Sequence, residues 1–152
     1  MAAGGKALAG AAVYIWHCDM VGRYSMYDAE IASENYLRGV QVSDKQGKVK
    51  FASIFPAAYS GRWPHVHFEV YESLEAATAA GSKLRTSQIA LPKDACDAVY
   101  ATDGYEQSVS NLSRVSLESD MVFSDGAELE TPTVTGSVDE GYAVALTVGV
   151  GG

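Results

Sequence analysis

Two of the three histidines stand two positions apart, at His65 and His67. On a β-strand, residues two apart point to the same face, so both imidazoles would share one face while Val66 and Phe68 point to the other. Neutral imidazole is a good ligand for zinc, copper, iron or nickel. The pattern therefore predicts a metal site, with two polar residues on a solvated strand face as the alternative interpretation.

The spacing of this pair leaves open what completes the ligand set. His17 is the third histidine and is followed by Cys18 and Asp19, so a three-histidine or histidine–cysteine zinc site, as in a zinc hydrolase, is one interpretation. The sequence lacks the local Cys/His pairs that structural zinc sites normally use. A second interpretation is an iron(II) site with two histidines and one carboxylate, in which Asp19 or Glu69 would be the carboxylate.

Nine tyrosines form the second chemical signal. Tyrosines inside strands usually pack their ring and leave the hydroxyl wet or hydrogen-bonded, but Tyr24 and Tyr59 lie in loops that follow strands, where functional residues concentrate. A phenolate is an anionic oxygen ligand known from iron proteins. Two phenolates beside two imidazoles would favour iron(III) over iron(II), because two anionic oxygens stabilise the higher charge.

Short runs of alternating apolar and polar residues would position these side chains. Turns rich in Gly, Asp and Ser separate the runs, and this pattern is typical of an all-β protein with an antiparallel β-sandwich core and long loops. One or two short helices are expected, at 92–100 and 74–80, while 108–117 fits either helix or loop. The expected strands are 13–18, 39–42, 48–55, 65–71, 133–136 and 141–148.

Composition limits the class of protein. With 152 residues, of which 47% are hydrophobic, one globular domain is expected over 1–152, with 1–6 as a frayed end or an addition to the natural chain. The net charge of −8 argues against a protein that binds nucleic-acid backbones. No apolar run approaches the roughly 18 residues of a membrane helix, and two cysteines are too few for a disulfide-built mini-protein.

Five segments, taken in chain order, resemble the intradiol ring-cleaving dioxygenases, the family of the catechol and protocatechuate dioxygenases. They include both tyrosines and the family's Arg-Pro-x-His-x-His strand, and together they run through most of the chain. The segments are VYIWHCD with GRYS (13–19 and 22–25), YLRGVQ with Asp44 and Gly47 (36–47), FASIFP with Tyr59 (51–59), RWPHVHF (62–68) and TSQI (86–89).

The resemblance implies a mononuclear non-haem iron(III) centre, with one Fe(3+) per chain. Its protein ligands would be Tyr24, Tyr59, His65 and His67. Tyr24 and His65 match the family's equatorial pair, and Tyr59 and His67 match the axial pair. In the family, a catechol binds the iron in place of the axial tyrosine, here Tyr59.

The same resemblance implies a catalytic set and a reaction. Tyr59 would accept a catechol proton, Arg62 would stabilise negative charge on the ring, and Gln88 would lie near the substrate. The expected oxidoreductase incorporates both atoms of O2 and cleaves catechol-type rings between the two hydroxylated carbons, giving cis,cis-muconate-type products in the breakdown of aromatic compounds and lignin. The alternative is a non-catalytic β-sandwich that binds carbohydrate or a protein through exposed aromatics such as Trp63.

Departures from the family pattern add further expectations. Trp63 stands between an arginine and a proline that are adjacent in many members, and the long N-terminal helical region of many intracellular members has no match. The chain is thus similar to the shorter, secreted members. This similarity implies an open site that would tolerate catechols with side chains, including lignin-derived ones, and an extracellular location, with the cytoplasm as the alternative. A Cys18–Cys96 disulfide would fit that compartment, with two buried thiols as the alternative. Some secreted members carry a carbohydrate-binding domain elsewhere in the chain.

Overall fold

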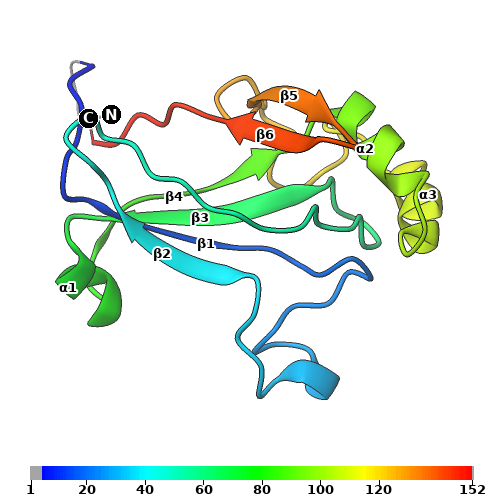
Figure 1. The fold of residues 1–152 in the computed structure, drawn as a ribbon, viewed down its shortest axis with the longest axis horizontal. Coiled ribbons are helices and arrows are strands. Elements are labelled where there is room, and N and C mark those ends of the chain that lie inside the picture. The colour runs from blue at the N-terminus through cyan, green and yellow to red at the C-terminus, as the bar shows by residue number, and fades with distance from the viewer. Residues whose placement is uncertain (1–4, 152) are drawn as a thin grey trace.

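The chain folds around a four-stranded antiparallel sheet, and a two-stranded ribbon lies beside it (Figure 1). The computed structural model describes residues 5–151, so most of the expected frayed segment 1–6 lies outside the described residues. In chain order the elements are β1 (Ala12–Trp16), a 3-10 helix (Ala29–Ile31), β2 (Arg38–Val42), β3 (His65–Tyr71), α1 (Leu74–Thr78), β4 (Lys83–Ala90), α2 (Lys93–Tyr100), α3 (Glu106–Leu112), β5 (Thr133–Ser137) and β6 (Gly141–Ala145).

Strand β3 is an inner strand of the sheet, whose order is β2-β1-β3-β4. It is paired with β1 on one side and β4 on the other, so that His67 stands opposite both Trp16 and Gln88. Phe68 and Val70 point to the other face, where both are buried. The predicted division of this strand into an apolar face and a histidine face is confirmed.

Two apolar cores fix the sheet in place. On the Phe68 face, the strand packs with Ala11 and Val150, and Leu146 of the C-terminal tail covers the cluster. The second core contains Phe123 and lies against α2 and α3. Figure 1 shows these two helices gathered at one end of the sheet and α1 at the other. The histidines therefore begin β3 at the end where the helices lie.

One expected strand is absent from the described residues. Segment 48–55 has no strand pairing, and the carbonyls at its end accept hydrogen bonds from side chains instead. Phe55 O accepts from Tyr105 Oη at 2.6 Å, and Pro56 O accepts from Tyr100 Oη at 2.9 Å. The expected last strand is also shorter, because β6 ends at Ala145.

Three α-helices occur in the part of the chain that the structure describes, more than the one or two expected. Helix α2 follows Pro92 as predicted, and the Ser73 hydroxyl caps α1 by accepting the N–H of Ala76 at 3.1 Å. Helix α3 covers the first part of the segment 108–117, which fitted helix or loop, and ends at Leu112. The strand-rich, antiparallel class with few short helices is confirmed, and none of the described helices is long and apolar enough to cross a membrane.

Candidate metal centre

Four side chains from three segments bring their donor atoms together near the start of β3. Tyr24 Oη lies 3.2 Å from Tyr59 Oη, 3.2 Å from His65 Nε2 and 3.0 Å from His67 Nε2. His65 Nε2 lies 3.2 Å from Tyr59 Oη and 3.1 Å from His67 Nε2. Two ligands that bind one ion at about 2.1 Å and at right angles are about 3.0 Å apart, so these separations suit donors around a single ion. We call these four residues the donor cluster.

The two tyrosines reach the donor cluster from separate loops. The Tyr24 N–H donates to Asp28 Oδ2 at 2.5 Å, which closes a turn around this residue. Tyr59 packs against Gly22: a Cβ placed on this glycine would lie 3.1 Å from Tyr59 Cβ, and its φ is +88°. A glycine at position 22 therefore allows the two loops to approach each other.

The two imidazoles are oriented by their neighbours. His65 Nδ1–H donates to the carbonyl of Trp63 at 2.5 Å. A carbonyl can only accept, so Nδ1 carries the proton and the Nε2 lone pair faces the donor cluster. The His67 ring stacks on Trp16, with centroids 4.6 Å apart and planes within 6°. Both rings thus present Nε2 toward the tyrosine oxygens.

The electrostatics of the donor cluster suit a highly charged cation. Burial lowers the pKa of His65 to about 4, and burial together with His65 lowers the pKa of His67 to about 3, so both rings are neutral at pH 7. Burial raises the pKa of the Tyr24 and Tyr59 phenols, because a buried phenolate has lost its hydration. A trivalent ion would compensate two phenolates, so the donor set of two oxygens and two imidazoles fits iron(III).

The other metal sites that the sequence left open are not formed. His17 is committed elsewhere: Nδ1 donates to the Cys18 carbonyl and Nε2 accepts from Ser53 Oγ, both at 2.7 Å. Asp19 pairs with an arginine and Glu69 with a lysine. Within residues 5–151, no group of three or more His, Cys, Asp or Glu side chains is arranged to hold a metal ion. The three-histidine zinc site and the two-histidine, one-carboxylate site are therefore wrong.

Arg62 and Gln88 lie together next to the donor cluster. Arg62 Nη2 donates to Gln88 Oε1 at 2.5 Å, and Gln88 stands opposite His67 in the sheet. Beyond the larger effect of burial, the positive charge of Arg62 lowers the pKa of each of the four donor residues. Asp120 is a further residue of this region that the sequence did not predict. Its Oδ2 accepts from Arg62 Nε at 2.8 Å, and its one sequence signal is its place before the apolar run 121–123.

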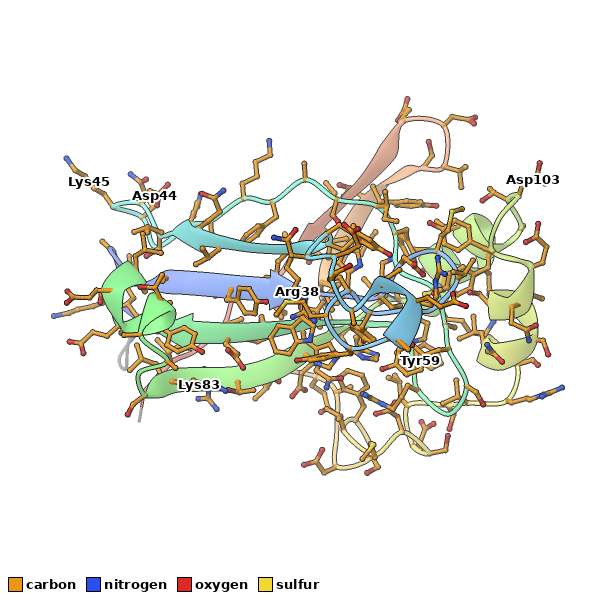
Figure 2. All side chains as sticks on the ribbon, turned by 90° about the horizontal axis from the view of Figure 1, so that it is seen from below. Arg38, Asp44, Lys45, Tyr59, Lys83 and Asp103 are labelled. Atoms are coloured by element: carbon orange, nitrogen blue, oxygen red, sulfur yellow. The ribbon has the colours of Figure 1, made fainter. Side chains whose placement is uncertain are left out.

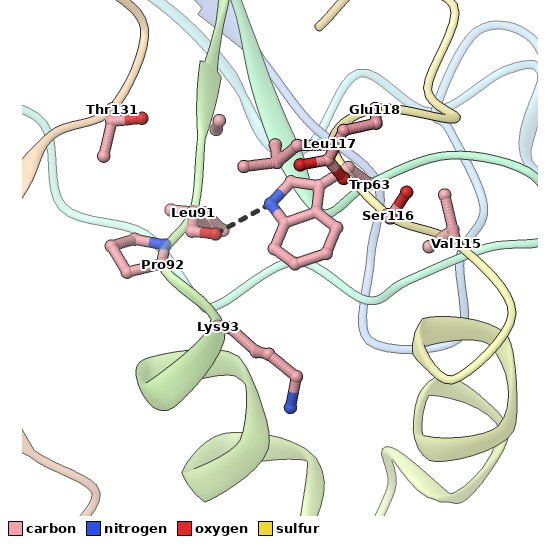
Figure 3. A pocket seen from close by; sticks show the side chains of 10 residues that line it. Trp63, Leu91, Pro92, Lys93, Val115, Ser116, Leu117, Glu118 and Thr131 are labelled. Atoms are coloured by element: carbon pink, nitrogen blue, oxygen red, sulfur yellow. Dashed lines mark hydrogen bonds between the residues drawn. The ribbon is translucent and has the colours of Figure 1, made fainter. Parts of the chain in front are cut away.

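Trp63 does not form an exposed aromatic platform. Its side chain is buried, and its Nε1–H donates to the Leu91 carbonyl at 2.9 Å (Figure 3). The indole lines a cavity of about 380 Å³ whose walls include none of the four donor residues. The hypothesis of a binding module that uses Trp63 as its contact surface is therefore not supported.

The two cysteines are free and buried, so the expected disulfide is wrong. Cys18 Sγ lies 3.5 Å from the Ala57 carbonyl, and Cys96 Sγ lies 3.9 Å from the Leu91 carbonyl. Burial raises the pKa of each thiol to about 12, so both remain protonated. The extracellular location thus has no support from a disulfide and stays a prediction.

Comparison with known proteins identifies the family of the chain. A family model described as "Dioxygenase" matches residues 1–109. Among curated proteins, the chain is 32% identical to "Catechol 1,2-dioxygenase 2" of Acinetobacter lwoffii, over 59% of this chain and 36% of that protein. It is 38% identical to a catechol 1,2-dioxygenase of Pseudomonas sp. (strain EST1001), over 36% of this chain and 18% of that one. The chain thus spans about a third or less of the length of these relatives.

Solved structures share the fold over nearly the whole chain. An intradiol ring-cleavage dioxygenase from Tetranychus urticae matches with a TM-score of 0.78 and 26% identity, over 97% of this chain and 74% of that one. The dioxygenase domain of a dioxygenase and carbohydrate-binding protein fusion from Streptomyces sp. SirexAA-E matches with a TM-score of 0.62 and 17% identity, over 98% and 73%. The family model covers well over half of the residues and agrees with these folds, and the chain belongs to the family of intradiol ring-cleavage dioxygenases.

Proposed function

We propose that the chain cleaves catechol-type rings and binds one Fe(III) through the donor cluster, Tyr24, Tyr59, His65 and His67. The observation that carries the proposal is the convergence of these four donor atoms, 3.0 to 3.2 Å apart, in a chain of this family. When bound, the iron would supply the Lewis-acid and redox chemistry through which a catechol reacts with O2.

The chain's own side chains would bind the catechol and move its proton. Tyr59 Oη would accept a proton from a catechol hydroxyl; burial raises its pKa, whereas the nearby Arg62 lowers it. The Arg62 guanidinium would stabilise the negative charge on the catechol oxygens and ring. Since Gln88 Oε1 accepts from Arg62, the Gln88 amide nitrogen is the group that remains to contact a substrate oxygen.

The finer parts of the proposal follow from the family. Both atoms of O2 would enter a cis,cis-muconate-type product, with the ring opened between its hydroxylated carbons, in the breakdown of aromatic compounds including those from lignin. Residues 1–152 would form one catalytic domain, with the four-stranded sheet and the β5–β6 ribbon as the layers of a β-sandwich. The Streptomyces protein, a fusion of a dioxygenase with a carbohydrate-binding protein, is the basis for proposing a carbohydrate-binding domain elsewhere in a longer chain. The extracellular location stays a prediction.

Colour is the sharpest test of this proposal. Protein loaded with ferric iron should be burgundy, because tyrosinate-to-iron(III) charge transfer absorbs visible light, and it should consume one O2 per catechol. Tyr59→Phe should change the visible band and reduce turnover. Tyr142→Phe, which alters a half-buried tyrosine of β6, is the matched control and should change neither. Protein that stays colourless after ferric loading, or that consumes no O2 with catechols, would contradict the proposal.

A further inference from the structure

A buried carboxylate outside the family motifs, Asp120, holds the guanidinium of Arg62. Its side chain is 0% exposed. Oδ2 accepts from Arg62 Nε and from the Trp63 N–H, both at 2.8 Å. Oδ1 accepts from the N–H groups of Val122 at 2.8 Å and Phe123 at 3.2 Å, and it lies 3.4 Å from Arg62 Nη2. Both oxygens are thus fully hydrogen-bonded.

These bonds fix the plane of the guanidinium. Nε is held by Asp120 and Nη2 by Gln88 Oε1, so two contacts on one edge of Arg62 define its orientation beside the donor cluster. The same carboxylate also accepts the Trp63 N–H, and the Trp63 carbonyl accepts from His65 Nδ1. A test of Asp120 must therefore separate an effect through Arg62 from an effect through His65.

Burying the Asp120–Arg62 ion pair costs desolvation free energy, which two apolar residues of the same volume would not cost. Burial raises the pKa of Asp120, but the hydrogen bonds from Arg62 and the backbone outweigh it, so the pKa lies below its usual value and the carboxylate is ionised. The Arg62 side chain is only 13% exposed. Buried ion pairs are often no more stable than apolar residues of the same volume. An orienting role explains the pair better than a contribution to stability.

We propose that Asp120 is a positioning residue of the active site, which holds the Arg62 guanidinium in the orientation that the ring-cleavage chemistry needs. The inference rests on the proposed function, and it concerns a residue beyond the 1–109 segment that the family model matches. Changing a residue that orients a metal ligand typically reduces activity about 10- to 100-fold, and we expect a loss of the same order when Arg62 loses its orienting partner.

A double-mutant cycle tests the proposal. Asp120→Asn keeps the side-chain shape but replaces one acceptor oxygen with an NH2 group. In the iron-loaded enzyme kcat/KM for catechol should fall about 10- to 100-fold, while iron content and the visible band are retained. In an Arg62→Ala background the same change should cost less than about twofold, because no guanidinium remains to be oriented.

Asp44→Asn is the matched control for the loss of a carboxylate. Asp44 Oδ1 accepts two backbone N–H groups, at 2.8 and 2.9 Å, and it lies at one end of the molecule, well separated from Tyr59 (Figure 2). Its replacement should leave kcat/KM unchanged. An unchanged kcat/KM in Asp120→Asn, or an equal loss with and without Arg62, would overturn the proposal, because Asp120 would then not act through the guanidinium.

A measurement on the wild-type chain decides the matter if Asp120→Asn does not fold. With gallium(III) in place of iron, the Nε–H resonance of Arg62 should exchange with solvent far more slowly than that of Arg114, whose side chain is exposed. Equal exchange rates would overturn the proposal. Failure of the proposed function can be told apart from failure of this inference. A colourless and inactive wild-type protein refutes the iron assignment, while the Nε–H resonance of Arg62 still reports on the Asp120–Arg62 pair.

Discussion

Replacing Gly22 with alanine should disturb the donor cluster more than it disturbs the fold. Gly22 has a φ of +88°, and an added Cβ would lie 3.1 Å from Tyr59 Cβ, whereas ordinary contact begins at 3.4 Å. A left-handed backbone costs a residue with a Cβ about 1–2 kcal/mol, which lowers Tm by roughly 2–8 °C in a domain of this size. In addition, Tyr59 must move by about 0.3–0.5 Å to relieve the contact.

The movement of Tyr59 sets the expected loss of activity. A displacement of 1 Å at a reacting group can cost about 100-fold in rate. If the activation free energy rises in proportion to the displacement, a shift of about 0.3–0.5 Å should cost about 4- to 10-fold in kcat/KM. Oxygen uptake measures this loss, and the visible band should shift with it.

Gly141→Ala is the control for the backbone strain alone. Gly141 has a φ of +86°, and an added Cβ would meet no atom within 4 Å. This variant should lose a similar amount of Tm and keep its kcat/KM and colour. If Gly22→Ala loses no more activity than Gly141→Ala, the close approach of Gly22 to Tyr59 has no functional role and the reasoning is refuted.

Thiol chemistry and acid stability provide two further tests. Burial raises the pKa of Cys18 and Cys96 to about 12, so both should resist alkylation at pH 8 in the folded protein and both should react in guanidinium chloride. Mass spectrometry measures the adducts. A protein mass lower by two hydrogens, with no adducts, would contradict the free thiols. Burial lowers the pKa of His65 to about 4 and that of His67 to about 3, below the ordinary 6.5. As the pH falls from 6.5 toward 4, the unfolded chain therefore binds more protons than the folded chain. The metal-free protein should lose stability across this window. Urea unfolding at pH 7 and pH 5 measures the loss, and equal stability at both values would contradict the assignment of buried neutral imidazoles.

Local patterns were sufficient to predict β3 and its two faces. The period of a strand places His65 and His67 on one side and Phe68 on the other, and the structure confirms this. Residue type and loop position singled out Tyr24 and Tyr59. Their convergence on the imidazoles depends on how separate loops pack, which alternation along the chain does not encode.

Contacts between distant residues explain what the sequence did not predict. Alternation in 48–55 predicts a strand, but the carbonyls of Phe55 and Pro56 bond to tyrosine side chains 50 and 44 residues away. Asp120 reaches Arg62 across 58 residues, and no spacing rule connects two such positions. Both features arise because buried polar groups must be hydrogen-bonded, and in this chain their partners come from residues far away in the sequence.

Two residues of the donor cluster stand on a strand and two on loops, and this division sets the order in which they would separate on warming. Strand β3 is hydrogen-bonded along both edges, whereas the two tyrosines stand on loops, and such loops open at a lower free energy than doubly paired strands. If iron binds as proposed, warming should therefore release the phenols first and leave the imidazoles in place. A pair of imidazoles without its anionic partners suits copper or zinc better than ferric iron. Moderate heat in the presence of these ions should then exchange the proposed iron before it unfolds the sheet.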